Sequence, residues 1–175
     1  PGRPPLDLMT EVEQALNIHA SPINWPIGSG SDFVGIVTRA DHRVQLFSKT
    51  AHGGATKVDV ANMVLADLER SGRVPPDVME PVQHDLELLD IAGNPFSRGQ
   101  FLNGDVTPVF FASALTNFGI ESFLDAFVTL APCPSARLAD REDGSECPID
   151  PVENPFSAYV FKLQANMNPK HRDST

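Results

Sequence analysis

The residues of this chain that could do chemistry fall in two segments. The first spans residues 107–119, where an apolar run is followed by Ser113-Ala114-Leu115 and then by a helical pattern. Small residues after a buried strand let the backbone approach a flat ring, and ligands of open α/β sheets bind at this end of the strands. The segment is therefore a candidate base-binding loop, although an ordinary strand–loop–helix would have the same pattern.

The second segment, residues 161–173, combines an expected strand with the basic group Lys170-His171-Arg172 in an otherwise acidic chain. These three side chains could face phosphate or a neighbouring domain. Charges at an exposed loop are usually just solvated. From the residues alone, a solvated hairpin tip is the favoured interpretation.

Other catalytic and phosphate-binding patterns are missing from the sequence. No GxxxxGK[ST] loop occurs, and the stretch Gly28-Ser29-Gly30 lacks the third glycine and the following helix of a dinucleotide-binding loop. The five histidines have no metal-ligand spacing, and no GxSxG elbow is present. We therefore expect no catalytic residue and no metal site in this chain.

Composition narrows the class of protein. The chain has 175 residues, 41% of them hydrophobic, which is typical of a globular chain. The net charge of −10 argues against stand-alone nucleic-acid binding. No apolar run approaches the ~20 residues of a membrane span. The 16 prolines exclude a single long helical bundle. Cys133 and Cys147 are expected to be free thiols of a reducing cytoplasm.

The periodicity of apolar residues predicts the elements that must hold the first segment. A small antiparallel sheet is expected from strands at 23–27, 33–37 and 43–47, with a short strand at 57–60. Residues 106–112 predict a strand buried on both faces, as in a parallel sheet. A short turn-bounded piece is expected at 101–104. Helices are predicted over residues 6–17, 61–70, 77–92 and 120–130.

Toward its C-terminus the sequence changes character. Residues 135–155 are acidic and rich in turn-forming residues, which is typical of a linker. Residues 156–164 alternate again and predict the first strand of another domain. An unpaired strand edge favours association between copies. We therefore expect the chain to self-associate through this strand.

Three stretches together resemble the bacterial class II peptide chain release factors, a family of translational GTPases that contains peptide chain release factor three. FFASALTNFG looks like the last guanine-recognition motif of that family, and FKLQANMNPKHRD is similar to the start of its second domain. INWPIGSGSDFVGIV resembles the insert between the fourth and fifth guanine motifs, which elongation factor G also carries.

The resemblance implies a fold class and a domain plan. Residues 1–134 would be the C-terminal part of an α/β, P-loop-type GTPase domain, with a small antiparallel insert at about 20–105. Residues 135–155 would be a linker, and 156–175 the start of a β-barrel domain. The phosphate loop, the switches and the NKxD motif would lie upstream of this chain.

The resemblance also implies an activity for the full-length parent. It would use GTP, with GDP as product and Mg²⁺ as cofactor, to remove class I release factors from the cytoplasmic ribosome. Ser113, Ala114 and Leu115 would contact the guanine base, the Ala114 N–H reaching its carbonyl. Lys170, His171 and Arg172 would face the ribosome or another domain. The chain alone is expected neither to bind nor to hydrolyse GTP.

Three alternatives remain from the sequence. The chain could be part of a translocase similar to elongation factor G, although ANMNPKHRD argues against it. It could be a non-catalytic module whose insert binds a ribosomal protein or a release factor. It could also be an unrelated α/β protein with chance motifs.

Overall fold

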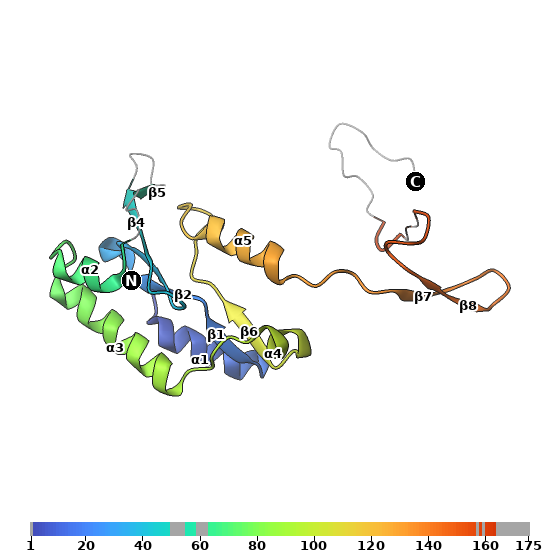
Figure 1. Cartoon of the computed structure of the whole chain (residues 1–175), viewed down its shortest axis with the longest axis horizontal. Coiled ribbons are helices and arrows are strands. Elements are labelled where there is room, and N and C mark those ends of the chain that lie inside the picture. The colour runs from blue at the N-terminus through green and yellow to red at the C-terminus, as the bar shows by residue number, and fades with distance from the viewer. Residues whose placement is uncertain (1, 50–54, 59–62, 157, 159, 164–175) are drawn as a thin grey trace. The chain divides into compact units, whose positions relative to one another are not determined.

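The chain folds into two compact units, Pro1–Ala131 and Pro132–Thr175. The computed structural model describes residues 2–49, 55–58, 63–156, 158 and 160–163. In its described residues, the first unit is a mixed α/β structure with two sheets, whose elements are labelled in Figure 1. The basic group 170–172 lies outside the described residues.

A parallel strand pair carries the first candidate segment. Strand β1 (His19–Pro22) pairs with β6 (Val106–Val109), His19 opposite Val106 and Pro22 opposite Val109. The predicted parallel strand is confirmed, but it is shorter than expected. Val106 is buried and the other three residues of β6 are only half-buried, so the expected burial on both faces is wrong. Among the described residues, this sheet consists of the two strands β1 and β6.

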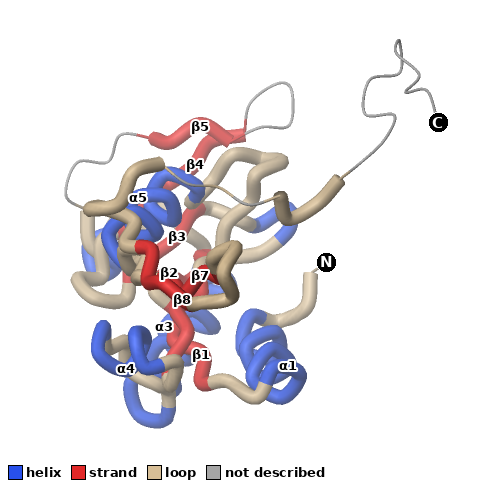
Figure 2. The backbone as a smooth tube through the Cα atoms, turned by 90° about the vertical axis from the view of Figure 1, so that its right-hand side faces the viewer, coloured by secondary structure: helices blue, strands red, loops and turns tan. Residues whose placement is uncertain are grey.

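The predicted antiparallel sheet is confirmed, and its described residues form four strands in sequence order. The short strand predicted at 57–60 begins two residues earlier, and residues 59–60 lie outside the described part. Figure 2 shows β3, β4 and β5 lying side by side. Alternation places the apolar residues Trp25, Ile27 and Val37 in the core, where each is fully buried. The strands are β2 (Asn24–Ile27), β3 (Gly35–Thr38), β4 (Val44–Lys49) and β5 (Ala55–Val58).

Most of the predicted helices form, with changes at their ends. The helix expected at 61–70 is a shorter helix, and its first expected residues lie partly outside the described part. The piece expected at 101–104 is the end of a helix that stops at Gly104, where the backbone turns left-handed. The helices are α1 (Pro5–Leu16), α2 (Leu65–Arg70), α3 (Pro76–Ala92), α4 (Arg98–Asn103) and α5 (Ile120–Leu130).

The core of the first unit lies between α3 and the antiparallel sheet. One face of α3 buries an apolar stripe at helical spacing that packs into a single cluster with Trp25, Ile27 and Val37. A carboxylate fixes the end of α1 to this body, because Glu13 accepts hydrogen bonds from the Ala20 N–H at 2.9 Å and the Asn94 side chain at 3.0 Å. The stripe consists of Met79, Val82, Leu86 and Leu89.

The second unit differs from the expected linker and strand. Residues 135–155 contain an antiparallel hairpin, β7 (Arg137–Asp140) with β8 (Glu146–Ile149). Asp143 closes its turn by accepting hydrogen bonds from the Ser145 N–H and hydroxyl. The strand predicted at 156–164 is wrong for residues 156, 158 and 160–163, which belong to no strand. Cys133 and Cys147 are free thiols, as predicted.

Candidate functional site

The Ser113-Ala114-Leu115 segment forms a tight turn between β6 and α5. Ser113 and Phe118 close the turn by exchanging backbone hydrogen bonds of 3.0 and 3.1 Å. Inside it, the Thr116 N–H donates to the Ser113 hydroxyl at 3.2 Å. These bonds give the turn a defined backbone geometry, which a loop needs if its N–H groups are to bind a ligand.

The tip of the turn is accessible. Ala114 is exposed, and 93% of the Leu115 surface is exposed. Within the described part of the chain, the N–H groups of Ala114 and Leu115 have no hydrogen-bond partner. The turn therefore presents two unused donors at the end of a parallel strand, the position expected for a base-binding loop.

Gly119 allows the turn to enter α5. It has φ +68°, and a Cβ atom at this position would lie 3.0 Å from the Phe111 carbonyl oxygen. Only glycine adopts this backbone conformation without strain. The Phe123 N–H then donates to the Gly119 carbonyl at 3.1 Å, which begins the helix.

A buried asparagine holds the strand just before the turn. The Asn24 side chain donates to the Phe111 carbonyl at 3.2 Å and accepts from the Phe111 N–H at 2.7 Å. The sequence interpretation missed this contact, since it treated Asn24 only as the polar member of an alternating strand. The sequence offered no signal for it, because alternation with Ile23 and Trp25 predicts that Asn24 lies on the solvent face of the strand.

Aromatic and polar contacts attach the far end of the turn to the antiparallel sheet. The Phe118 ring centroid lies 4.3 Å from that of Phe33 and 5.9 Å from that of Phe47. At the start of α5, Ser122 accepts a hydrogen bond from Gln45 of β4 at 3.0 Å. The antiparallel sheet and the loop before β3 thus contact the end of the turn. Phe118 belongs to the predicted segment 107–119, whereas Phe33, Gln45 and Phe47 were not predicted to belong to the site.

Trp25 joins β2 to α3 beneath the strand that precedes the turn. Its ring meets Phe111 edge-on with centroids 5.0 Å apart, and its Nε1–H donates to the Asp85 carboxylate at 3.3 Å. Burial raises the pKa of Asp85, while the hydrogen bond from Trp25 and the charge of His84 act in the opposite direction. Asp85 also lines a hollow of about 210 Å³ with Asp32 and Asp77.

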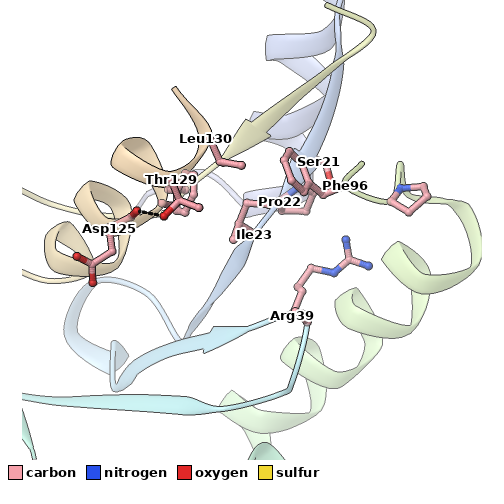
Figure 3. A pocket seen from close by; sticks show the side chains of 12 residues that line it. Ser21, Pro22, Ile23, Arg39, Phe96, Asp125, Thr129 and Leu130 are labelled. Carbon is pink, nitrogen blue, oxygen red and sulfur yellow. Dashed lines mark hydrogen bonds between the residues drawn. The ribbon is translucent and has the colours of Figure 1, made fainter. Parts of the chain in front are cut away.

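A separate cavity of about 560 Å³ lies between α5, β1 and Arg39 (Figure 3). Its lining is mostly apolar, and the Arg39 guanidinium beside it forms a 2.7 Å ion pair with Asp90. No residue of the turn 113–117 lines the cavity. The cavity and the candidate loop are therefore two different features of the first unit.

The apolar face of α5 is largely exposed. Phe127 is 59% and Val128 is 80% exposed, and no residue of α5 is fully buried. Among the described residues, no cluster of three His, Cys, Asp or Glu could hold a metal ion, and no helix is long and apolar enough to cross a membrane.

These features define a mixed α/β protein in which a parallel strand leads to a hydrogen-bonded turn. The N–H groups of Ala114 and Leu115 in this turn have no partner among the described residues. No family model matches the sequence. The chain is 45% identical to peptide chain release factor 3 of Symbiobacterium thermophilum, over 98% of this chain and 31% of that protein. Proteins of the same name from Enterococcus faecalis and Lactobacillus acidophilus are 42% and 45% identical over 98% of this chain.

The chain therefore belongs to the peptide chain release factor 3 family, and it spans about a third of the length of these curated relatives. A crystal structure of a protein from Thermus thermophilus superposes with a TM-score of 0.45 at 19% identity, over 76% of this chain and 21% of that one. That likeness is too distant to define the fold.

Proposed function

We propose that this chain is part of a ribosome-associated GTPase of translation termination, which uses GTP to release class I release factors from the ribosome. The observation that carries the proposal is the 40–45% identity to peptide chain release factor 3 along nearly the whole chain. In such a GTPase, bound Mg²⁺ and positively charged groups stabilise charge on the transferred phosphate. The positively charged side chains and the Mg²⁺ site would lie in the rest of the parent protein. The parent would act in the cytoplasm.

Within this parent, residues 1–134 would form the C-terminal part of a P-loop-type GTPase domain, with the insert at about 20–105. The β7–β8 hairpin would lie in the connecting segment 135–155, and residues 156–175 would begin the β-barrel domain. Lys170, His171 and Arg172 would contact the ribosome or a neighbouring domain. The parallel β1–β6 pair and the antiparallel sheet beside it support this division.

The guanine base would be bound by the turn at Ser113, Ala114 and Leu115. The free N–H groups of Ala114 and Leu115 support this role, because backbone donors with fixed geometry can select a carbonyl oxygen. The chain contributes binding of the base, and it supplies no residue to the hydrolysis of the phosphate bond.

The proposal is tested with the full-length parent and with this chain alone. The parent should hydrolyse GTP in the presence of ribosomes and should speed the departure of a class I release factor after peptide release. The chain alone should show neither activity and no heat of GDP binding in calorimetry. Micromolar GDP binding by the chain alone, or a parent inactive on both counts, would contradict the proposal.

A further inference from the structure

The contact between Asn24 and Phe111 replaces a peptide group. The β1–β6 ladder ends at Pro22 and Val109, and the Ile23 N–H still donates to the Val109 carbonyl at 2.9 Å. The chain then turns away to join the antiparallel sheet, where Asn24 is opposite Thr38. From there the Asn24 side-chain amide satisfies both the N–H and the carbonyl of Phe111, in place of the backbone groups that a longer ladder would supply.

This contact lies close to the candidate loop along the chain. Only Ala112 separates Phe111 from Ser113, whose backbone closes the turn with Phe118. Asn24 is 3% exposed, so water cannot easily replace its hydrogen bonds. The position of the Phe111 peptide therefore fixes where the turn begins.

The other end of the turn is fixed by the same sheet. Phe118 packs against Phe33 and Phe47, while Ser122 bonds to Gln45. All four partners, counting Asn24, belong to residues 24–47 of the insert sheet and its loops. A rigid turn needs both of its ends held, and here the insert holds both.

We propose that Asn24 is a positioning residue for guanine recognition, acting through Phe111 on the N–H groups of the turn at Ser113, Ala114 and Leu115. This inference rests on the proposed function, since it assigns a task to the same loop. It adds that the insert is a part of the base-binding site without touching the base. Phe118 would have the same role at the other end of the turn.

The test compares two nucleotides in the full-length GTPase. GDP has the 6-carbonyl that the turn would bind, and 2-aminopurine riboside diphosphate lacks it. Asn24→Leu should weaken GDP binding about tenfold, the size expected when a buried hydrogen-bonding group loses its partner. It should leave binding of the second nucleotide unchanged within about twofold, because that nucleotide makes no bond to the turn.

Two further variants keep the test decisive. Asn24→Asp keeps the acceptor for the Phe111 N–H and loses the donor to its carbonyl, so it should fall between the wild type and Asn24→Leu. Asn94→Ala, the matched control, removes an asparagine whose side chain bonds to Glu13 of α1. It should change the affinity for neither nucleotide.

Hydrogen exchange in the same proteins distinguishes failure of this inference from failure of the proposed function. Asn24→Leu should speed amide exchange over residues 110–119 and leave α3 unchanged. An equal loss of affinity for both nucleotides, or unchanged exchange at the turn, would overturn the inference. If the wild-type protein bound no GDP, the proposed function would fail instead, while exchange at the turn would still decide whether Asn24 positions it.

Discussion

Buried polar side chains at single positions connect the layers of the first unit. Asn24 and Trp25 are neighbours on β2, and each bonds to a different element, Asn24 to Phe111 and Trp25 to Asp85. Trp25 is fully buried, so its indole N–H requires a partner inside the protein. The Asp85 carboxylate accepts this hydrogen bond and is partly desolvated. The stability of the protein should therefore depend on the ionisation of Asp85.

Replacing Asp85 by asparagine should change how stability depends on pH. The pKa of Asp85 is raised in the folded chain, so the folded state binds the proton more readily than the unfolded state, and stability falls as the pH rises through that raised pKa. Asp85→Asn keeps an oxygen for Trp25 and cannot ionise. It should therefore be at least as stable as the wild type at neutral pH.

This advantage of Asp85→Asn should shrink as the pH falls toward about 4, the ordinary pKa of an aspartate. Thermal unfolding followed by circular dichroism at several pH values measures it. Glu87→Gln, an exposed position on the same helix, controls for the loss of one charge. An advantage that grows on acidification would contradict the assignment.

At the scale of elements, Gly119 connects the turn after β6 to helix α5, because it adopts the left-handed backbone conformation that this connection requires. Gly119→Ala should destabilise the protein by about 1–2 kcal/mol from the left-handed backbone, and further through the approach to the Phe111 carbonyl. Gly104→Ala is the matched control, with φ +84° and no heavy atom near the added Cβ.

Denaturant unfolding should therefore show a larger loss for Gly119→Ala than for Gly104→Ala. Equal losses would mean that the close approach at Phe111 has no cost. Nucleotide affinity of the full-length protein should also fall only for Gly119→Ala, because only that residue borders the turn.

Periodicity predicted the elements whose apolar residues recur regularly. Helix α3 and the strands β2 to β4 are examples, since burial of one face imposes the period on the sequence. Strand β1 was missed because His-Ala-Ser-Pro has no β-branched or aromatic residue, and its pairing with β6 spans most of the unit. The exposure of the apolar face of α5 could not be predicted, because amphipathicity shows that one face of a helix is apolar and does not show what covers it.

The candidate loop was found from local sequence, whereas its supports were not. Ser113, Ala114 and Leu115 stand in one motif, and the structure places them in a turn closed by Ser113 and Phe118. Their contact with a guanine base stays a prediction. Asn24, Phe33 and Gln45 reach the site only through tertiary contacts between residues as many as 87 positions apart. Such contacts leave no spacing in the sequence that a motif could capture.

On the scale of the whole molecule, the chain has two compact units and spans about a third of the length of its curated relatives. Both observations are consistent with a chain that is part of a longer protein. The net charge of −10 disfavours nucleic-acid binding by this chain alone. Ribosome contact would then depend on the rest of the parent and on Lys170, His171 and Arg172.

Self-association of the isolated chain stays a prediction, with a changed physical basis. The described residues near the C-terminus form no strand, but large apolar side chains there are almost fully exposed, among them Phe156 and Leu163. Exposed apolar groups favour association. Light scattering should detect dimers or larger species of the 175-residue chain and fewer of them after truncation at residue 155. A monodisperse monomer of the full chain would count against it.

The most direct test of the central claim is GDP binding by the full-length protein with one backbone donor removed. Ala114→Pro deletes the N–H that would reach the guanine carbonyl, and Ala114→Ser keeps it with a side chain of similar size. Calorimetry should show affinity reduced about tenfold or more for Ala114→Pro and unchanged for Ala114→Ser. Equal GDP affinity in the wild type and Ala114→Pro would show that this turn does not bind the base.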